Sequence, residues 1–150
     1  MGEFQFDIQL VPNAAVSKGD SDIEIVVSED GLETSGWWVS NQPSSNYQEI
    51  ISSSFGPIES SIPDILRWGA EDEILVEVFA ENGVVEGVSA RIDVRQVDYV
   101  ALGRLSALAE SLQSCIYVMS TKCIISPDTD SLLQAVQESK AFAYANLTSE

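Results

Sequence analysis

The sequence predicts an α+β fold: a mostly antiparallel sheet with two C-terminal helices packed on one face, in a single domain of residues 1–150. Three observations support this prediction. Alternating apolar and polar residues, typical of strands, recur up to Val94. An Asn-Gly turn inside the segment 74–95 predicts a hairpin. Two stretches with helical periodicity then follow in the last third of the chain.

The first forty residues predict short strands separated by loops. In "FQFDIQLV", residues 4–11, alternate apolar side chains lie on one side, which predicts the first strand. Residues 22–28 predict a second strand, which ends at the turn signal Glu29-Asp30-Gly31. Residues 32–40 allow a third strand.

The segment 41–64 is rich in serine and contains three prolines. We expect loops here, with a short strand at 47–52 and a helical turn at 63–68. Its isoleucines and its phenylalanine require burial. The segment is therefore expected to wrap over the sheet, and it is not expected to separate two domains.

The hairpin in residues 74–95 allows two registers. A two-residue Asn82-Gly83 loop pairs Ala80 with Val85, whereas a three-residue loop pairs Ala80 with Val84. Only the second register gathers the apolar residues of both strands on one face. Because a slip of one residue exchanges the two faces, we expect the three-residue loop.

The hairpin ends in "RIDVR", residues 91–95, which resembles a charged site. In the expected register, Arg91, Asp93 and Arg95 alternate onto the face away from the core, and Glu73 lies opposite Arg91. Asp98 is close enough in sequence to pair with Arg95. We therefore interpret this stretch as a strand with locally compensated charges.

The remaining residues predict a helix over 98–114, a strand over 115–119 and a second helix over about 129–144. Residues 122–125 either continue the strand or turn back beside it. The acids expected to cap the helices are Asp98 for the first and Asp128 or Asp130 for the second.

Charge is the strongest global property of the chain, with 24 acidic against 7 basic residues and a net charge of −17. Residues 1–90 hold 17 of the acids and 2 of the bases. Such a surface repels nucleic acid and anionic membranes and attracts basic partners. The alternative reading is that the acidity serves solubility alone.

The composition argues against several kinds of chemistry. Without histidine, the chain lacks the commonest general base and metal ligand, and a Ser-His-Asp triad cannot form. Cys115 and Cys123 alone do not make a zinc site, and Asp128 with Asp130 offers too few oxygens for a hard cation. We therefore expect no enzymatic activity, no cofactor and no metal. A small hydrolase is the least favoured alternative.

The sequence also bears on location. No apolar run reaches the roughly eighteen residues of a membrane span, and the N-terminus lacks the basic and apolar regions of a secretory signal. A cytoplasmic protein is therefore expected.

Two adjacent tryptophans in "GWWVSN", residues 36–41, predict a binding surface. On a strand, Trp37 and Trp38 would point to opposite faces, so one of them would lie outside the core. An exposed tryptophan suits contact with a basic partner, because its ring binds cations and often dominates interfaces. Alternatively, the segment 41–64 buries it.

The block from Arg67 to Leu147 contains "RWG", a hairpin ending in "RIDVR", a helix with "LSALAESL", a strand with a cysteine and "IISPDTDSLLQAVQESKAFAYANL". This block is similar to a pattern found in small uncharacterised bacterial proteins, some of them immunity proteins. The resemblance implies a compact α+β protein and favours an inhibitor of a basic effector. It brings no catalytic motif.

We therefore expect a non-enzymatic acidic binding protein of the immunity or inhibitor type, which neutralises a basic protein such as a toxin or effector. The alternative is an adaptor or a structural subunit of a homo-oligomer, such as a homodimer. The residues expected to contact the partner are Trp37, Trp38, Glu71, Asp72, Glu73, Glu77 and Glu81.

Overall fold

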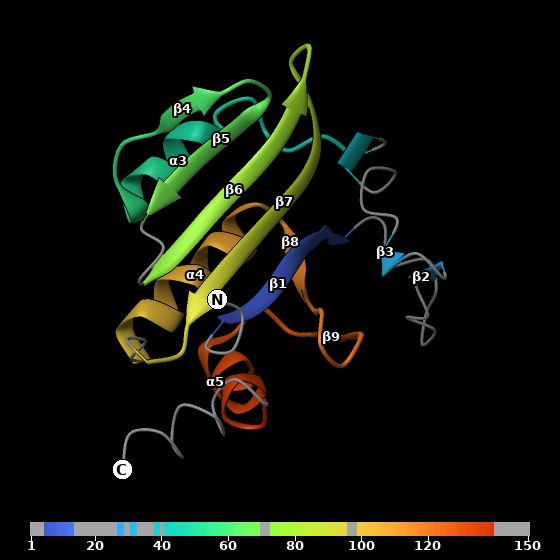
Figure 1. Cartoon of the computed structure of the whole chain (residues 1–150), viewed down its shortest axis with the longest axis vertical. Helices are drawn as coiled ribbons and strands as arrows, with labels where there is room; N and C mark the ends of the chain where they lie inside the picture. The colour runs from blue at the N-terminus through green and yellow to red at the C-terminus, as the bar shows by residue number, and fades with distance from the viewer. Residues whose placement is uncertain are drawn as a thin grey trace.

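The computed structural model describes residues 5–13, 27–28, 31–32, 38–39, 41–69, 73–95 and 99–139. Across these residues, the main sheet has seven strands, every neighbouring pair antiparallel, in the order β4-β5-β6-β7-β1-β8-β9 (Figure 1). The strands are β1 (Gln5–Pro12), β4 (Glu59–Ile62), β5 (Ile65–Gly69), β6 (Ile74–Glu81), β7 (Val84–Asp93), β8 (Ser114–Val118) and β9 (Cys123–Ile125). A separate pair consists of β2 (Val27–Ser28) and β3 (Gly31–Leu32).

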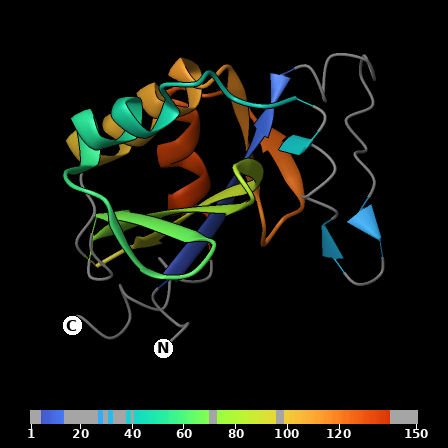
Figure 2. The same ribbon diagram turned by 90° about the horizontal axis from the view of Figure 1, so that it is seen from above.

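The helices of the described part are α3 (Tyr47–Phe55), α4 (Tyr99–Ser111) and α5 (Thr129–Gln137). Figure 2 shows all of them on the same side of the main sheet. The predicted α+β class, with an antiparallel sheet and two C-terminal helices on one face, is confirmed. The helix α3 was not predicted, and it covers the sheet beside β5.

The central strand β1 is as predicted. Phe6, Ile8 and Leu10 alternate toward the helices and are all buried. Ile8 lies opposite Ala90 of β7 on one side and Val118 of β8 on the other, so β1 joins strands from both halves of the sequence. Its apolar side chains belong to the core that α4 and α5 close.

Two predictions for the segment 41–69 were wrong. Residues 47–52, expected as a strand, begin α3, because Tyr47, Ile50, Ile51 and Phe55 follow a helical spacing that packs on the core. The expected helical turn at 63–68 is largely β5, whose backbone pairs with β6 from Ile65 to Gly69. The prediction that this segment wraps over the sheet is confirmed, since α3 contacts β5 and α4.

The hairpin register also differs from the prediction. The loop has two residues, so Ala80 lies opposite Val85, and both Asn82 (φ 55°) and Gly83 (φ 83°) have the positive φ of a type I′ turn. A bulge next to Ala80 then inserts one extra residue into β7. Beyond the bulge, every side chain therefore lies on the same face of the sheet as it would with a three-residue loop. The apolar residues of both strands still share the inner face.

The charged end of the hairpin changes its partners accordingly. Arg91 lies opposite Leu75 and not opposite Glu73 as predicted. Glu73 instead accepts a backbone hydrogen bond at its carbonyl oxygen from the Asp93 N–H, at 2.8 Å.

The C-terminal elements agree with the prediction where they are described. Residues 123–125 turn back beside β8, which settles the two alternatives for that stretch. Asp128 caps α5, because its carboxylate accepts a hydrogen bond from the Ser131 backbone N–H at 2.8 Å. Asp98 and the residues after 139 lie outside the described part.

The predicted strands of residues 22–40 lie mostly outside the described residues. Val27–Ser28 and Gly31–Leu32 form their short antiparallel pair. Trp38 and Val39 lie in a helical turn and not in a strand.

Candidate functional site

The sheet has an outer face, defined as the face away from α3, α4 and α5. The register places one row of side chains across all seven strands of this face. From β4 to β9 the row reads Glu59, Arg67, Glu77, Ser89, Gln9, Tyr117 and Ile124. Polar side chains predominate in this row, as expected for the outer side of an antiparallel sheet, although Tyr117 is buried.

Three arginines on or beside this face form ion pairs. Arg67 Nε lies 2.7 Å from Glu77 Oε2, and Arg91 Nε lies 3.1 Å from Asp7 Oδ1. The Arg91 pair is nearly half exposed at both side chains, so it stabilises the fold little. The arginines therefore neutralise carboxylates within the face, and they add no free positive charge to it.

The third pair joins Arg95 to Asp93, a carboxylate with a side chain only 5% exposed. Arg95 donates to it from its backbone N–H, its Nε and its Nη2, at 2.8–3.0 Å. These hydrogen bonds lower the pKa of Asp93 despite the desolvation that burial imposes. The charges of "RIDVR" are compensated locally, as predicted, but by other partners: Arg91 pairs with Asp7, and Arg95 pairs with the buried Asp93. The strand also ends at Asp93, so residues 94–95 form a turn, and Asp98 lies outside the described residues.

One end of the outer face differs from the rest, and we call it the hairpin-end surface. Ile62 of β4 lies opposite Ile65 of β5, which lies opposite Phe79 of β6, so these side chains form a continuous apolar row. Ile62 is 40% exposed and Phe79 37%. The hairpin-end surface comprises Ile62, Asp64, Ile65, Phe79, Glu81 and Val84.

The hairpin-end surface also carries uncompensated negative charge. Asp64 and Glu81 are both exposed, and neither forms an ion pair in the part of the chain that the structure describes. Asp64 is held at the turn before β5 with φ 67°, and its carbonyl oxygen accepts a hydrogen bond from the Ala80 N–H at 3.0 Å. This bond fixes the turn against β6, beside the hairpin tip.

The structure corrects part of the predicted partner-binding set. Trp38 is 1% exposed, and its indole N–H donates to the Leu10 carbonyl oxygen at 2.8 Å, so it is a core residue and cannot contact a partner. The indole fits there because the pairing of β1 with β7 ends at Gln9, which leaves the Leu10 carbonyl group to accept from it. Trp37, Glu71 and Asp72 lie outside the described residues.

The described acids of that set are not gathered in one place. Glu73 precedes β6 and Glu81 ends it, so the length of an eight-residue strand, roughly 25 Å, separates them. Glu77 lies between them, but Arg67 neutralises it. Only Glu81 belongs to the hairpin-end surface. The exposed apolar residues beside it were missed, because β5 brings Ile62 next to Phe79 and β5 itself was not predicted.

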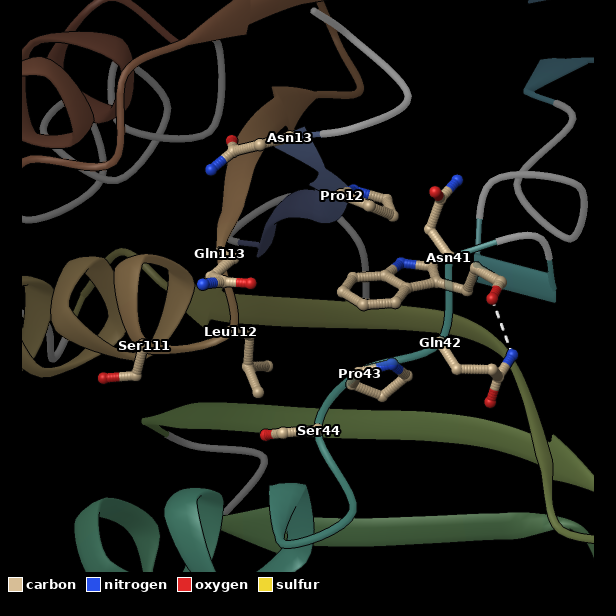
Figure 3. Close-up of a pocket in the computed structure, with 10 residues that line it drawn as sticks. Pro12, Asn13, Asn41, Gln42, Pro43, Ser44, Ser111, Leu112 and Gln113 are labelled. Carbon is tan, nitrogen blue, oxygen red and sulfur yellow. Dashed lines mark hydrogen bonds between the residues drawn. The ribbon is translucent and has the colours of Figure 1, made fainter.

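A second feature is a hollow of about 460 Å³ at the end of β1. Three separate stretches surround it, 12–13, 41–44 and 111–113, together with Trp38 (Figure 3). The lining residues are Pro12, Asn13, Trp38, Asn41, Gln42, Pro43, Ser44, Ser111, Leu112 and Gln113. We call this hollow the amide pocket, because four of its side chains end in carboxamides.

Gln42 has a structural role in the amide pocket. Its Nε2 donates to the carbonyl oxygens of Trp38 at 2.6 Å and Val85 at 2.9 Å, and its Oε1 accepts from the Val85 N–H at 2.9 Å (Figure 3 shows the first bond). The Gln42 amide thus ties the stretch after Trp38 to the hairpin. Its hydrogen-bonding groups are already used within the protein.

Other residue types offer little chemistry in the described part. No group of three or more histidine, cysteine, aspartate or glutamate residues there is arranged to hold a metal ion. Both cysteines are free thiols, and burial raises the pKa of the Cys115 thiol, which keeps it protonated and unreactive. Asp130 accepts a hydrogen bond from the Tyr99 hydroxyl at 3.1 Å, while Asp128 is occupied as a helix cap.

No helix among the described residues is long and apolar enough to cross a membrane. The chain matches no family model, no curated protein and no solved structure.

Proposed function

We propose that this is a non-enzymatic binding protein of the immunity or inhibitor type, which docks its hairpin-end surface on a basic segment of a partner protein and neutralises it. The observation that carries the proposal is that exposed apolar side chains lie beside carboxylates that form no ion pair with any described residue. Interfaces combine such an apolar centre with a polar rim.

The charge distribution supports a basic partner. The chain carries a net charge of −17, and three of the five basic residues in the described part form ion pairs with carboxylates there. The long-range field is therefore strongly negative, and it would steer a positively charged protein toward this one. Asp64 and Glu81 then provide carboxylates that have no ion pair to break within the described residues before they contact lysine or arginine.

The apolar row supports affinity beyond charge. Ile62, Phe79 and Val84 expose between 37% and 40% of their surface. Because burial of a whole side chain of this size contributes roughly 1.5–3 kcal/mol, covering the exposed part of all three contributes about 2–3 kcal/mol. A partner with apolar groups beside its basic residues would therefore bind more tightly than a purely basic one.

The test is calorimetric titration with purified basic proteins encoded beside this gene, at low and at raised salt. The double variant Asp64→Asn/Glu81→Gln should bind roughly tenfold more weakly at low salt and show a smaller salt dependence. Phe79→Thr, which keeps a good strand former at the position, should also weaken binding by roughly tenfold but leave the salt dependence unchanged.

The matched control is Glu49→Gln/Glu110→Gln, which removes the same charge from exposed positions of α3 and α4, on the helix side of the sheet. It should bind like the wild type. If no neighbouring gene product binds at low salt, or if both double variants lose the same affinity, the hairpin-end surface is not the docking site.

A homo-oligomer remains the second candidate, because Ile58 and Ile62 are exposed at the edge of the sheet beside β4. Light scattering separates the two. A stable dimer that Ile62→Thr converts to a monomer would favour the structural subunit, whereas a monomer at all concentrations supports the inhibitor.

A further inference from the structure

The amide pocket differs in its chemistry from the rest of this acidic protein. None of the ten described residues that line it carries a charge, in a chain with a net charge of −17. Its volume of about 460 Å³ is within the range of small-molecule sites. Among the described lining residues a cation would find no carboxylate, and an anion would be opposed by the field of the whole protein. The pocket therefore suits a neutral ligand.

Not all of its amides are committed to the fold. Gln113 is exposed, and its side chain forms no hydrogen bond within the described residues. Asn13 accepts the Cys115 thiol at its Oδ1, at 3.1 Å, which leaves its NH₂ group able to donate. In contrast to the fully bonded Gln42, these two side chains offer donors and an acceptor to a ligand.

The backbone of Gln113 is consistent with a role for its side chain. Gln113 has φ 56°, a conformation that glycine or asparagine adopts with less strain. Two hydrogen bonds of 2.9 Å hold it there, from its N–H to Glu110 and from the Asn13 N–H to its carbonyl oxygen. A long carboxamide is thus projected from a fixed turn at a position where the fold alone would prefer a smaller residue.

The other side chains of the pocket are apolar or small. Pro12, Pro43 and Leu112 come from the same three stretches and present carbon surface between the amides (Figure 3). A ligand that fits must combine C–H surface with adjacent hydrogen-bond donors and acceptors. Vicinal hydroxyl groups on a sugar ring have this combination, since each hydroxyl both donates and accepts.

We propose that the amide pocket binds a neutral saccharide, with Asn13 and Gln113 contacting its hydroxyl groups. This site is independent of the hairpin-end surface and of the proposed inhibitor function. For a ligand of the size of a monosaccharide, the ligand efficiency expected of small molecules corresponds to a dissociation constant of roughly a millimolar.

The test is NMR titration of the full-length protein, with the side-chain NH₂ signals of Asn13 and Gln113 as the readout. The probes are glucose, galactose, mannose, N-acetylglucosamine, maltose and sucrose, with acetamide as a neutral amide that lacks hydroxyl groups. At least one saccharide should shift these signals saturably, and acetamide should not.

Gln113→Gly removes the carboxamide at a position where glycine is favoured, so this variant should fold, and it should bind at least roughly tenfold more weakly. Gln137→Ala, at the exposed end of α5, is the matched control and should bind like the wild type. The proposal is overturned if no saccharide shifts the signals saturably, if acetamide shifts them equally, or if Gln113→Gly binds unchanged.

Discussion

Substitution of Gly69 tests how tightly β5 is fixed against the start of β6. Gly69 has φ 91°, and a Cβ atom added there would overlap the Ile74 carbonyl oxygen and lie 3.2 Å from its carbonyl carbon. Both are backbone atoms of a paired strand, so they cannot rotate away as a side chain would. Gly83 is the matched control, because it has a similar φ of 83° but no heavy atom within 4 Å of the added Cβ.

The two glycines separate the cost of the backbone conformation from the cost of the overlap. A left-handed φ costs a residue with a Cβ about 1–2 kcal/mol, and the reduced freedom of the unfolded chain offsets about 0.4–1 kcal/mol of this. Gly83→Ala should therefore lose about 1 kcal/mol of unfolding free energy. Gly69→Ala should lose about 1–3 kcal/mol more, because relief of the overlap requires a backbone shift.

Urea unfolding followed by tryptophan fluorescence measures both variants, since Trp38 and Trp68 are buried and report loss of the core. Equal destabilisation by the two variants would refute this reasoning. It would mean that β5 moves freely away from Ile74 and that the close approach at Gly69 does not fix the sheet.

Three further substitutions test individual interactions by the same unfolding measurement. Trp38→Phe should lose about 2–4 kcal/mol, because a buried carbonyl group loses its donor and the smaller ring leaves a void. Asp93 has a pKa below its usual value of 3.8 because Arg95 donates to it, so its contribution to stability is present above that pH and is lost as the pH falls through the lower, folded-state pKa. Wild-type stability should therefore fall more steeply in acid than that of Asp93→Asn, and parallel curves would contradict the assignment. Ser106→Ala should gain about 0.5–1 kcal/mol, since the Ser106 hydroxyl is buried without a partner in the described residues and alanine is the better helix former.

The sequence predicted the elements in which local pattern and tertiary packing agree. Alternation in β1 and the apolar stripe of α4 each point to the face that is buried in the fold. The segment that contains α3 and β5 was predicted wrongly. Its serines and prolines suggested loops, and its few apolar residues, which pack on the core, were too widely spaced to indicate a helix and a strand. The hairpin has a two-residue loop and a bulge, and together they place the side chains on the same faces as a three-residue loop would. The alternation in the sequence shows only which residues share a face, so it could not distinguish these two arrangements.

The candidate surfaces were harder to predict than the fold. The alternation within β6 does indicate that Phe79 and Glu81 share a face. It does not indicate that β4 and β5 bring Ile62 and Asp64 beside them. The amide pocket is assembled from three stretches that are distant in sequence, so no local motif marks it. Trp38 was ambiguous for the same reason, because its indole pairs with the Leu10 carbonyl group of β1, 28 positions away in the sequence.

The place of β1 in the sheet has a consequence for assembly. The strands from β4 to β7 pair with neighbours in sequence, and so do β8 and β9, but β1 is the only described strand that connects these two groups. Its contacts are long-range, such as the Arg91–Asp7 pair, whose residues are 84 positions apart. The two groups can form hairpins early, whereas closure of the whole sheet must wait for an insertion that costs much loop entropy. A chain without residues 1–13 would present two facing strand edges, and a synthetic peptide of Gln5–Pro12 added in trans should restore the fold, as in donor-strand complementation.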